Sequence, residues 1–160
     1  MSYQLIYGDC LEVMPTLADK SIDSIICDLP YGTTNCSWDS AIPFEPLWAQ
    51  YKRIIKPRGA IVLFGSQPFT SALIMSNIDW FKYCWVWEKN ISTGFSHCAN
   101  MPLKNYEDVA VFSNGIIQHK QLTEKRMNYN PQGLQIYRKI NHRGSKCFSG
   151  TMERKSQVNN

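Results

Sequence analysis

The stretch Ile22-Asp23-Ser24-Ile25-Ile26-Cys27-Asp28-Leu29-Pro30-Tyr31 decides the fold class of this chain. Its first six residues form a mostly apolar run, which is typical of a strand buried in a sheet. A carboxylate, a proline and an aromatic ring follow at the point where this strand ends. Because ligands of open α/β sheets bind at the carboxyl ends of strands, we expect a binding site at residues 28–31.

The tetrapeptide offers what an exocyclic amino group on a planar base needs. Asp28 can accept one hydrogen bond, and the Leu29 carbonyl can accept a second, since the Pro30 ring restricts the chain around it. Tyr31 can stack on the base. The alternative for Asp28 is an ordinary turn residue, because Asp-x-Pro is common in turns.

Strands and helices alternate in the rest of the pattern. Strands are predicted at 3–7, 22–27, 60–64, 80–88 and 108–113, and helices at 11–17, 44–55 and 68–77. The segment 44–55 has the clearest helical spacing of apolar residues. This alternation predicts an α/β fold with a mostly parallel sheet.

Length and composition bound the class of protein. With 160 residues, 44% of them hydrophobic, the chain suits one domain with a packed core. No membrane span or signal segment is expected. The six cysteines form no C-x-x-C pair and His97-Cys98 lacks ligand spacing, so we expect no metal site and reduced thiols in a cytoplasmic protein.

Charge is distributed unevenly along the chain. Residues 1–114 carry a net charge of −3 and residues 115–160 a net charge of +7. The basic segment indicates a polyanionic partner, and its alternative is a solvated, disordered tail.

Several segments occur in an order that resembles a known family. They are Gly8-Asp9-Cys10-Leu11-Glu12, residues 23–32, Trp38-Asp39, residues 51–65 and Asn105-Tyr106-Glu107. Together, over residues 3–114, they resemble the amino-group DNA methyltransferases, which methylate N6 of adenine or N4 of cytosine with S-adenosylmethionine. The catalytic motif lies near the N-terminus, as in the permuted subgroup. The resemblance implies a Rossmann-like methyltransferase sheet, DNA as partner and a bacterial or phage source.

The resemblance also implies roles at the matching catalytic positions. Asp28 and the Leu29 carbonyl accept the amino hydrogens of the target base, Pro30 fixes the loop, and Tyr31 stacks on the flipped base. An Asp at the first motif position is closer to the adenine enzymes, because the cytosine enzymes more often carry Ser there.

A cofactor segment is implied earlier in the chain. Asp9 and Cys10 match the segment that lines the adenine ring of S-adenosylmethionine, with Asp28 beside the cofactor as well. The alternative for Asp9 is the cap of the short helix that follows it.

Three departures from the family pattern stand out. Leu29 replaces the more frequent Pro, and Tyr106 stands where many relatives have His. The Gly-rich cofactor motif and the His-Pro-Thr-Gln-Lys-Pro-like segment before it are missing. We therefore expect a sheet that is incomplete at the C-terminus, with a missing C-terminal part or a second chain completing the cofactor pocket.

The predicted division places a catalytic methyltransferase part at 1–114 and the start of a basic target-recognition region, or a disordered tail, at 115–160. The aromatic residues Phe81, Tyr83, Trp85 and Trp87 are expected to share one strand face and to lie in the core rather than form a base-stacking platform. Lys89-Asn90 is expected in a solvated loop, with contact to the target strand as the alternative.

The sequence thus predicts an S-adenosylmethionine-dependent DNA methyltransferase acting on adenine N6, of the kind found in restriction–modification. One alternative is a catalytically inactive remnant that binds DNA non-specifically. Another is the same chemistry on RNA or on a protein amide nitrogen.

Overall fold

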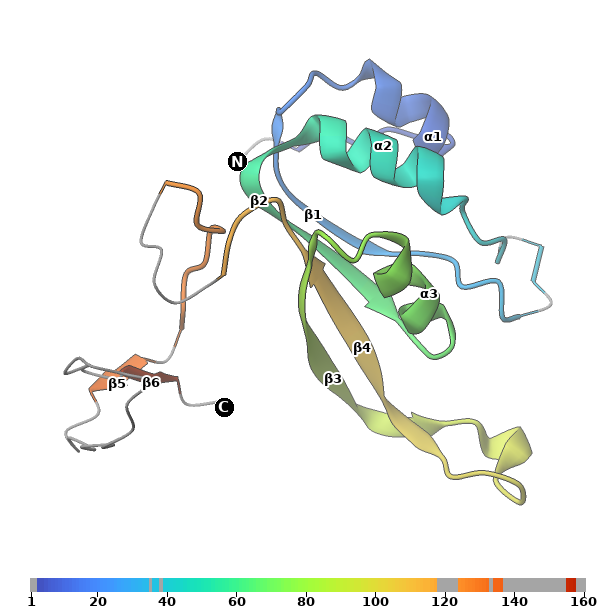
Figure 1. Cartoon of the computed structure of the whole chain (residues 1–160). Coiled ribbons are helices and arrows are strands. Elements are labelled where there is room, and N and C mark those ends of the chain that lie inside the picture. Colours follow the sequence, from blue (N-terminus) through green and yellow to red (C-terminus); the bar gives the residue numbers. More distant parts are fainter. Residues whose placement is uncertain are drawn as a thin grey trace. The chain divides into compact units, whose positions relative to one another are not determined.

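The computed structural model describes residues 3–34, 36–37, 39–117 and 124–132, and the backbone of 134–136 and 155–157 (Figure 1). The chain divides into two compact units, Met1–Asn128 and Tyr129–Asn160. Trp38 and most of the basic segment 115–160 lie outside the described residues. The functional division predicted at residue 114 therefore stays a prediction.

The first unit contains three α-helices, two short 3-10 helices and four strands among its described residues. In chain order they are α1 (Cys10–Val13), η1 (Met14–Thr16), β1 (Ile22–Asp28), α2 (Phe44–Ile54), β2 (Ile55–Gly65), α3 (Phe69–Ser76), β3 (Phe81–Thr93), η2 (Phe95–His97) and β4 (Lys104–Phe112). The second unit contains the antiparallel pair β5 (Leu134–Ile136) and β6 (Lys155–Gln157). No helix among the described residues is long and apolar enough to cross a bilayer.

The four strands of the first unit pair in the order β1-β2-β4-β3. β1 runs parallel to β2, whereas β4 is antiparallel to both β2 and β3. The α/β prediction is confirmed, but the prediction of a mostly parallel sheet is wrong for these strands. The crossover through α2 makes β1 and β2 parallel, while residues 94–103 contain only η2 and connect β3 to β4 as a hairpin.

One face of the sheet is covered by helices and forms the core. Ile61 and Leu63 of β2 and Ala110 and Phe112 of β4 point to this face and are at most 1% exposed. They pack with the apolar side of α2, as the predicted helical spacing requires. That side consists of Leu47, Trp48, Tyr51 and Ile54, all buried.

The opposite face is more open along the edge strands β1 and β3, although Val109 and Val111 of the central strand β4 are buried on it. Alternation along the strands puts Ile26, Phe64, Trp85 and Trp87 on it. Ile26 is 71% exposed and Trp85 and Trp87 are each 50% exposed. Trp87 packs edge-on against Phe64, with the ring centroids 5.8 Å apart. The expected core position of these tryptophans is therefore wrong.

A register shift in β3 explains why the aromatic residues do not share a face. The pairing with β4 shifts between Phe81 and Tyr83. Phe81 therefore lies on the helix-covered face against Phe112, at a centroid distance of 5.8 Å, whereas Tyr83, Trp85 and Trp87 lie on the open face. Alternation in the sequence does not record such a shift.

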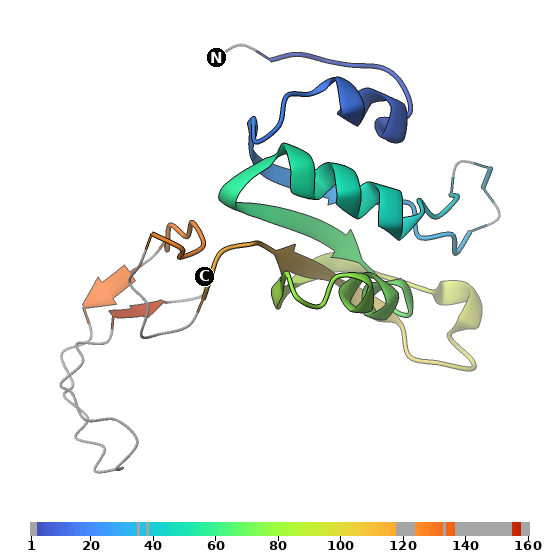
Figure 2. The same ribbon diagram turned by 45° about the horizontal axis from the view of Figure 1, so that its top comes forward.

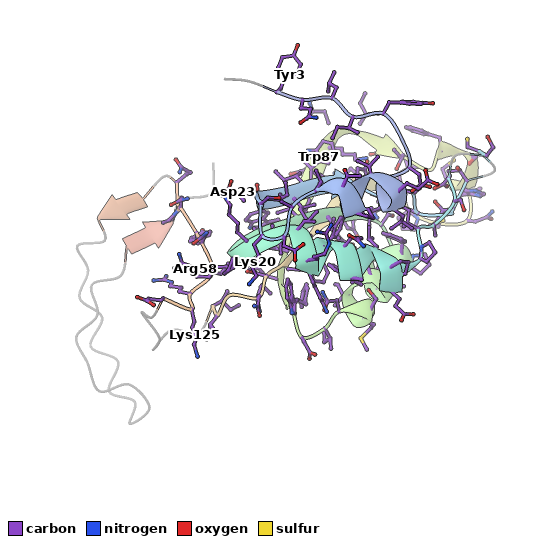
Figure 3. All side chains as sticks on the ribbon, turned by 90° about the horizontal axis from the view of Figure 1, so that it is seen from above. Tyr3, Lys20, Asp23, Arg58, Trp87 and Lys125 are labelled. Atoms are coloured by element: carbon purple, nitrogen blue, oxygen red, sulfur yellow. The ribbon has the colours of Figure 1, made fainter. Side chains whose placement is uncertain are left out.

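The N-terminal segment does not form the predicted strand. Residues 3–7 have no regular secondary structure, and Tyr3, Leu5 and Tyr7 are 89%, 88% and 105% exposed. Figure 2 shows the segment running apart from the sheet, and Figure 3 shows the Tyr3 side chain extending away from the other side chains. A strand needs a partner edge as well as a suitable pattern, and residues 3–7 pair with no described strand.

Candidate functional site

The tetrapeptide of residues 28–31 lies where the sequence places it, at the carboxyl end of β1. Asp28 is the last residue of the strand, pairs with Phe64 of β2 and is exposed. Leu29, the next residue, is only 5% exposed and belongs to the hydrophobic core. Leu29 therefore anchors the motif, while the carboxylate before it stays accessible.

Tyr31 contacts Asp28 directly. Its hydroxyl donates a hydrogen bond of 2.7 Å to Asp28 Oδ1. Its ring stacks on Phe69, at the start of α3, with the centroids 4.9 Å apart and an interplanar angle of 30°. Burial is the main reason that the pKa of Tyr31 lies above its usual value. The hydrogen bond to Asp28 and the negative charge of Asp28 raise this pKa further. The hydroxyl therefore stays protonated and able to donate at neutral pH.

The start of β4 brings further charged residues to the same edge of the sheet. Asp108 pairs with Gly65 of β2 and accepts a hydrogen bond of 3.0 Å from the Thr70 hydroxyl. Glu107 forms an ion pair with Lys89 of β3. The charges of Glu107 and Asp108 make small contributions to the raised pKa of Tyr31, after burial and Asp28, so both carboxylates lie near its hydroxyl. Lys89 thus lies in the strand β3 and is paired with Glu107, so the expectation of a solvated loop is wrong for it.

Asp39 is a site residue to which the sequence assigned no role. Its Oδ1 accepts from the Gly32 amide at 2.8 Å, and its Oδ2 accepts from the Thr33 and Thr34 amides at 2.9 and 2.6 Å and from the Thr34 hydroxyl at 2.7 Å. These hydrogen bonds lower the pKa of the Asp39 carboxyl to about 2. The bond from the Thr34 hydroxyl has the largest effect, and the bond from the Gly32 amide has the next largest.

Asp39 therefore fixes the loop that follows Tyr31. Gly32 is where this loop turns back: its φ is +68°, and an added Cβ would lie 3.4 Å from the Ala41 side chain. We call the four hydrogen bonds from residues 32–34 to this carboxylate the Asp39 clamp. An aspartate several residues beyond a glycine is too common a pattern to reveal it from sequence alone.

The candidate cofactor residues begin α1. Asp9 Oδ1 accepts a hydrogen bond of 2.8 Å from the Leu11 amide, which is the capping role considered for it. Asp9 and Cys10 are both exposed. Burial raises the pKa of the thiol of Cys27, the residue before Asp28. The nearby Cys10 raises it further. The start of α1 therefore lies near the end of β1.

Solved structures resemble this chain in fold. A protein from Thermus thermophilus considered to be a DNA modification methylase matches with a TM-score of 0.50 and 15% identity, over 72% of this chain and 54% of that chain. The M1.HpyAVI–SAM complex matches with a TM-score of 0.49 and 22% identity, over 77% and 61%. The cytosine-N4-specific PvuII DNA methyltransferase matches with a TM-score of 0.48 and 14% identity, over 66% and 47%.

The Thermus match bears on the fold alone, and it shows that this chain has an α/β fold similar to that protein's. No family model matches the chain. The chain spans about half to three-fifths of the length of these structures. Activity, substrate and cofactor are therefore matters for proposal, and the roles of Asp28, Leu29, Pro30, Tyr31, Asp9 and Cys10 stay predictions.

Proposed function

We propose that this chain belongs to an S-adenosylmethionine-dependent DNA methyltransferase and provides the site that binds adenine for methylation at N6. The observation that carries the proposal is the accessible carboxylate of Asp28, in contact with Tyr31 at the carboxyl end of β1. The ordered motifs of the sequence give the chemistry, and the fold shared with the Thermus protein supports it.

The geometry supports a specific way of holding the amino group of a base. The Tyr31 hydroxyl donates a hydrogen bond to Asp28 Oδ1. A hydrogen-bond donor of the substrate would take the position of this hydroxyl. An incoming amino group displaces this hydroxyl or uses the other carboxylate oxygen, and donates its second hydrogen to the Leu29 carbonyl. Two acceptors on one nitrogen favour a pyramidal geometry with an available lone pair.

The base reaches this position only outside the duplex stack. Extruding it costs a few kcal/mol, which contacts with aromatic rings offset in part. Tyr31 is already held against Phe69, so its ring is ordered before the base arrives. The Asp39 clamp on residues 32–34 keeps the following loop in place during this exchange.

The residues at the start of α1 fit the cofactor. The Asp9 carboxylate uses one oxygen as a cap and is exposed, so it can still accept hydrogen bonds from ribose hydroxyls or an adenine amino group. When bound, S-adenosylmethionine supplies an electrophilic methyl group on its sulfonium centre. We propose that Asp9, Cys10 and Asp28 hold it beside the base, and that further polypeptide completes the pocket.

Labelled methyl transfer tests the proposal. The chain is incubated with radiolabelled S-adenosylmethionine and unmethylated DNA, and the nucleosides are then separated. We expect label in N6-methyladenine. Label in N4-methylcytosine would correct the base, and label only in RNA or protein would correct the substrate class.

Calorimetry addresses the cofactor site directly. We expect S-adenosylmethionine to bind the chain and Asp9→Ala to weaken the binding. If neither binding nor transfer is measurable, the chain by itself does not have the proposed function.

Non-specific DNA binding without catalysis is the second candidate. The net charge of +7 on residues 115–160 favours it. It predicts DNA binding that falls steeply with salt and is the same for every sequence, with no methyl transfer. A flat salt response would exclude it.

A further inference from the structure

Lys104, the first residue of β4, is held beside the candidate site by two neighbours. Its Nζ donates a hydrogen bond of 2.7 Å to the Ser66 hydroxyl, which follows the end of β2. The same Nζ lies 4.8 Å from the centroid of the Tyr106 ring, a cation–π contact. Lys104 is partly buried and Tyr106 is 42% exposed. The ammonium is therefore oriented and not freely extended into solvent.

The position of Ser66 places this ammonium within one nucleotide's reach of Asp28. Phe64 pairs with Asp28, and Ser66 lies two residues further along the chain. Neighbouring strands are about 4.8 Å apart and two extended residues span about 7 Å. A base with its amino group at Asp28 therefore has its sugar and phosphate at about the distance of Lys104.

The charge of Lys104 is not used in an ion pair within the described part of the chain. The ion pairs there are Arg53–Asp19, Lys56–Asp23 and Lys89–Glu107. Of the carboxylates near the site, Asp28 accepts from Tyr31, Asp108 accepts from Thr70, and Glu107 is paired. An ammonium has three donors, and only one is directed at Ser66, so donors remain for an anion.

We propose that Lys104 binds a backbone phosphate of the target nucleotide while the base lies at Asp28, with Ser66 and Tyr106 orienting the ammonium. The inference rests on the proposed function, because it takes Asp28 as the base site. The competing role is structural: Lys104 would then only balance the nearby carboxylates and contribute to stability.

Salt-dependent binding of a fluorescein-labelled single-stranded oligodeoxyadenylate tests this role. In single strands each phosphate contact contributes about 0.7 to the slope of log K against log salt. We expect Lys104→Ala to reduce the slope by about 0.7 and to weaken binding several-fold at moderate salt. Lys104→Arg keeps the charge and should keep the slope.

The matched control is Lys52→Ala. Lys52 is exposed on α2, and its Nζ lies 5.2 Å from the Trp80 centroid. Its removal also deletes one charge and one cation–π contact, at the opposite end of β4 from Lys104. It should leave the slope at the wild-type value. Circular dichroism and thermal unfolding of each variant confirm folding, and Lys104→Gln replaces Lys104→Ala if the latter unfolds.

Two results for Lys104→Ala would overturn the inference: a salt slope equal to that of the wild type, or a loss of oligonucleotide affinity equal to that of Lys52→Ala. A wild-type chain that does not bind the oligonucleotide would overturn it as well. Methyl transfer is measured separately. Transfer without a slope change rejects only the phosphate contact, whereas a slope change without transfer rejects only the proposed activity.

Discussion

The two faces of the sheet are formed by the same strands but are covered very differently. Ile61 of β2 points to the helix-covered face and is fully buried, whereas Ile26 of β1 points to the open face and is 71% exposed. The first face holds the fold together through α2 and α3. The second leaves aromatic and aliphatic side chains accessible. Large exposed apolar areas of this kind are typical of interaction surfaces.

The candidate site lies at the boundary between these faces. Asp28 follows Ile26 on the open face, while the next residue, Leu29, is buried in the core of the other. Adjacent residues of one motif thus differ in burial: Leu29 is held in the core on one face, and Asp28 stays accessible because the other face is open beside it.

The largest expected effect is loss of stability on the covered face. Ile61→Ala leaves a cavity against α2 and should lower the free energy of unfolding by about 2–5 kcal/mol. Urea unfolding followed by circular dichroism measures this change. A cost below about 1 kcal/mol would mean that the helices do not pack on this face as described.

An intermediate effect is expected at the boundary. Asp39→Ala removes the acceptor of four hydrogen bonds from residues 32–34 and should release this loop while the rest of the fold persists. Hydrogen exchange of the Gly32, Thr33 and Thr34 amides should become faster by about tenfold or more. Unchanged exchange of these amides would contradict the clamp.

Acid should release the same loop in the unchanged protein. The folded pKa of Asp39, about 2, lies below the ordinary value of 3.8, so the clamp stabilises the fold above about pH 4 and is lost as the pH falls from there through 2. Amide protection at Gly32–Thr34 should fall over this interval. Loss of that protection already above pH 5 would show that another group controls the loop.

The smallest expected effect belongs to the open face. Ile26→Ala should change the free energy of unfolding by no more than about 0.5 kcal/mol, because the side chain is already exposed. The same urea titration as for Ile61→Ala measures it. A cost comparable with that of Ile61→Ala would show that this face is covered in solution, for example by a second copy of the chain.

Much of the covered face was predictable from sequence, because its signals are local. The spacing of Leu47, Trp48, Tyr51 and Ile54 correctly predicts α2 and its buried side. The apolar runs correctly place β1 and the core residues of β2. The same pattern ends the strand at Cys27, one residue before the observed end of β1 at Asp28.

What the sequence missed depends on partners distant in the chain. Periodicity at Tyr3–Tyr7 and in β3 does not record which edge a strand meets or where its register shifts, so the unpaired N-terminal segment and the exposed Trp85 and Trp87 were not expected. The Ser66–Lys104 contact joins residues far apart in the chain, and no local pattern marks it.

The most direct test of the account compares two exposed residues on the open face of β1. Asp28→Ala and Ile26→Ala are assayed for transfer of labelled methyl groups from S-adenosylmethionine to adenine in DNA. If Asp28 holds the reacting amino group, Asp28→Ala should lower the rate by about 100-fold or more, while Ile26→Ala keeps the wild-type rate within a few-fold. Equal rates in the two variants would contradict the assignment of Asp28 as the acceptor.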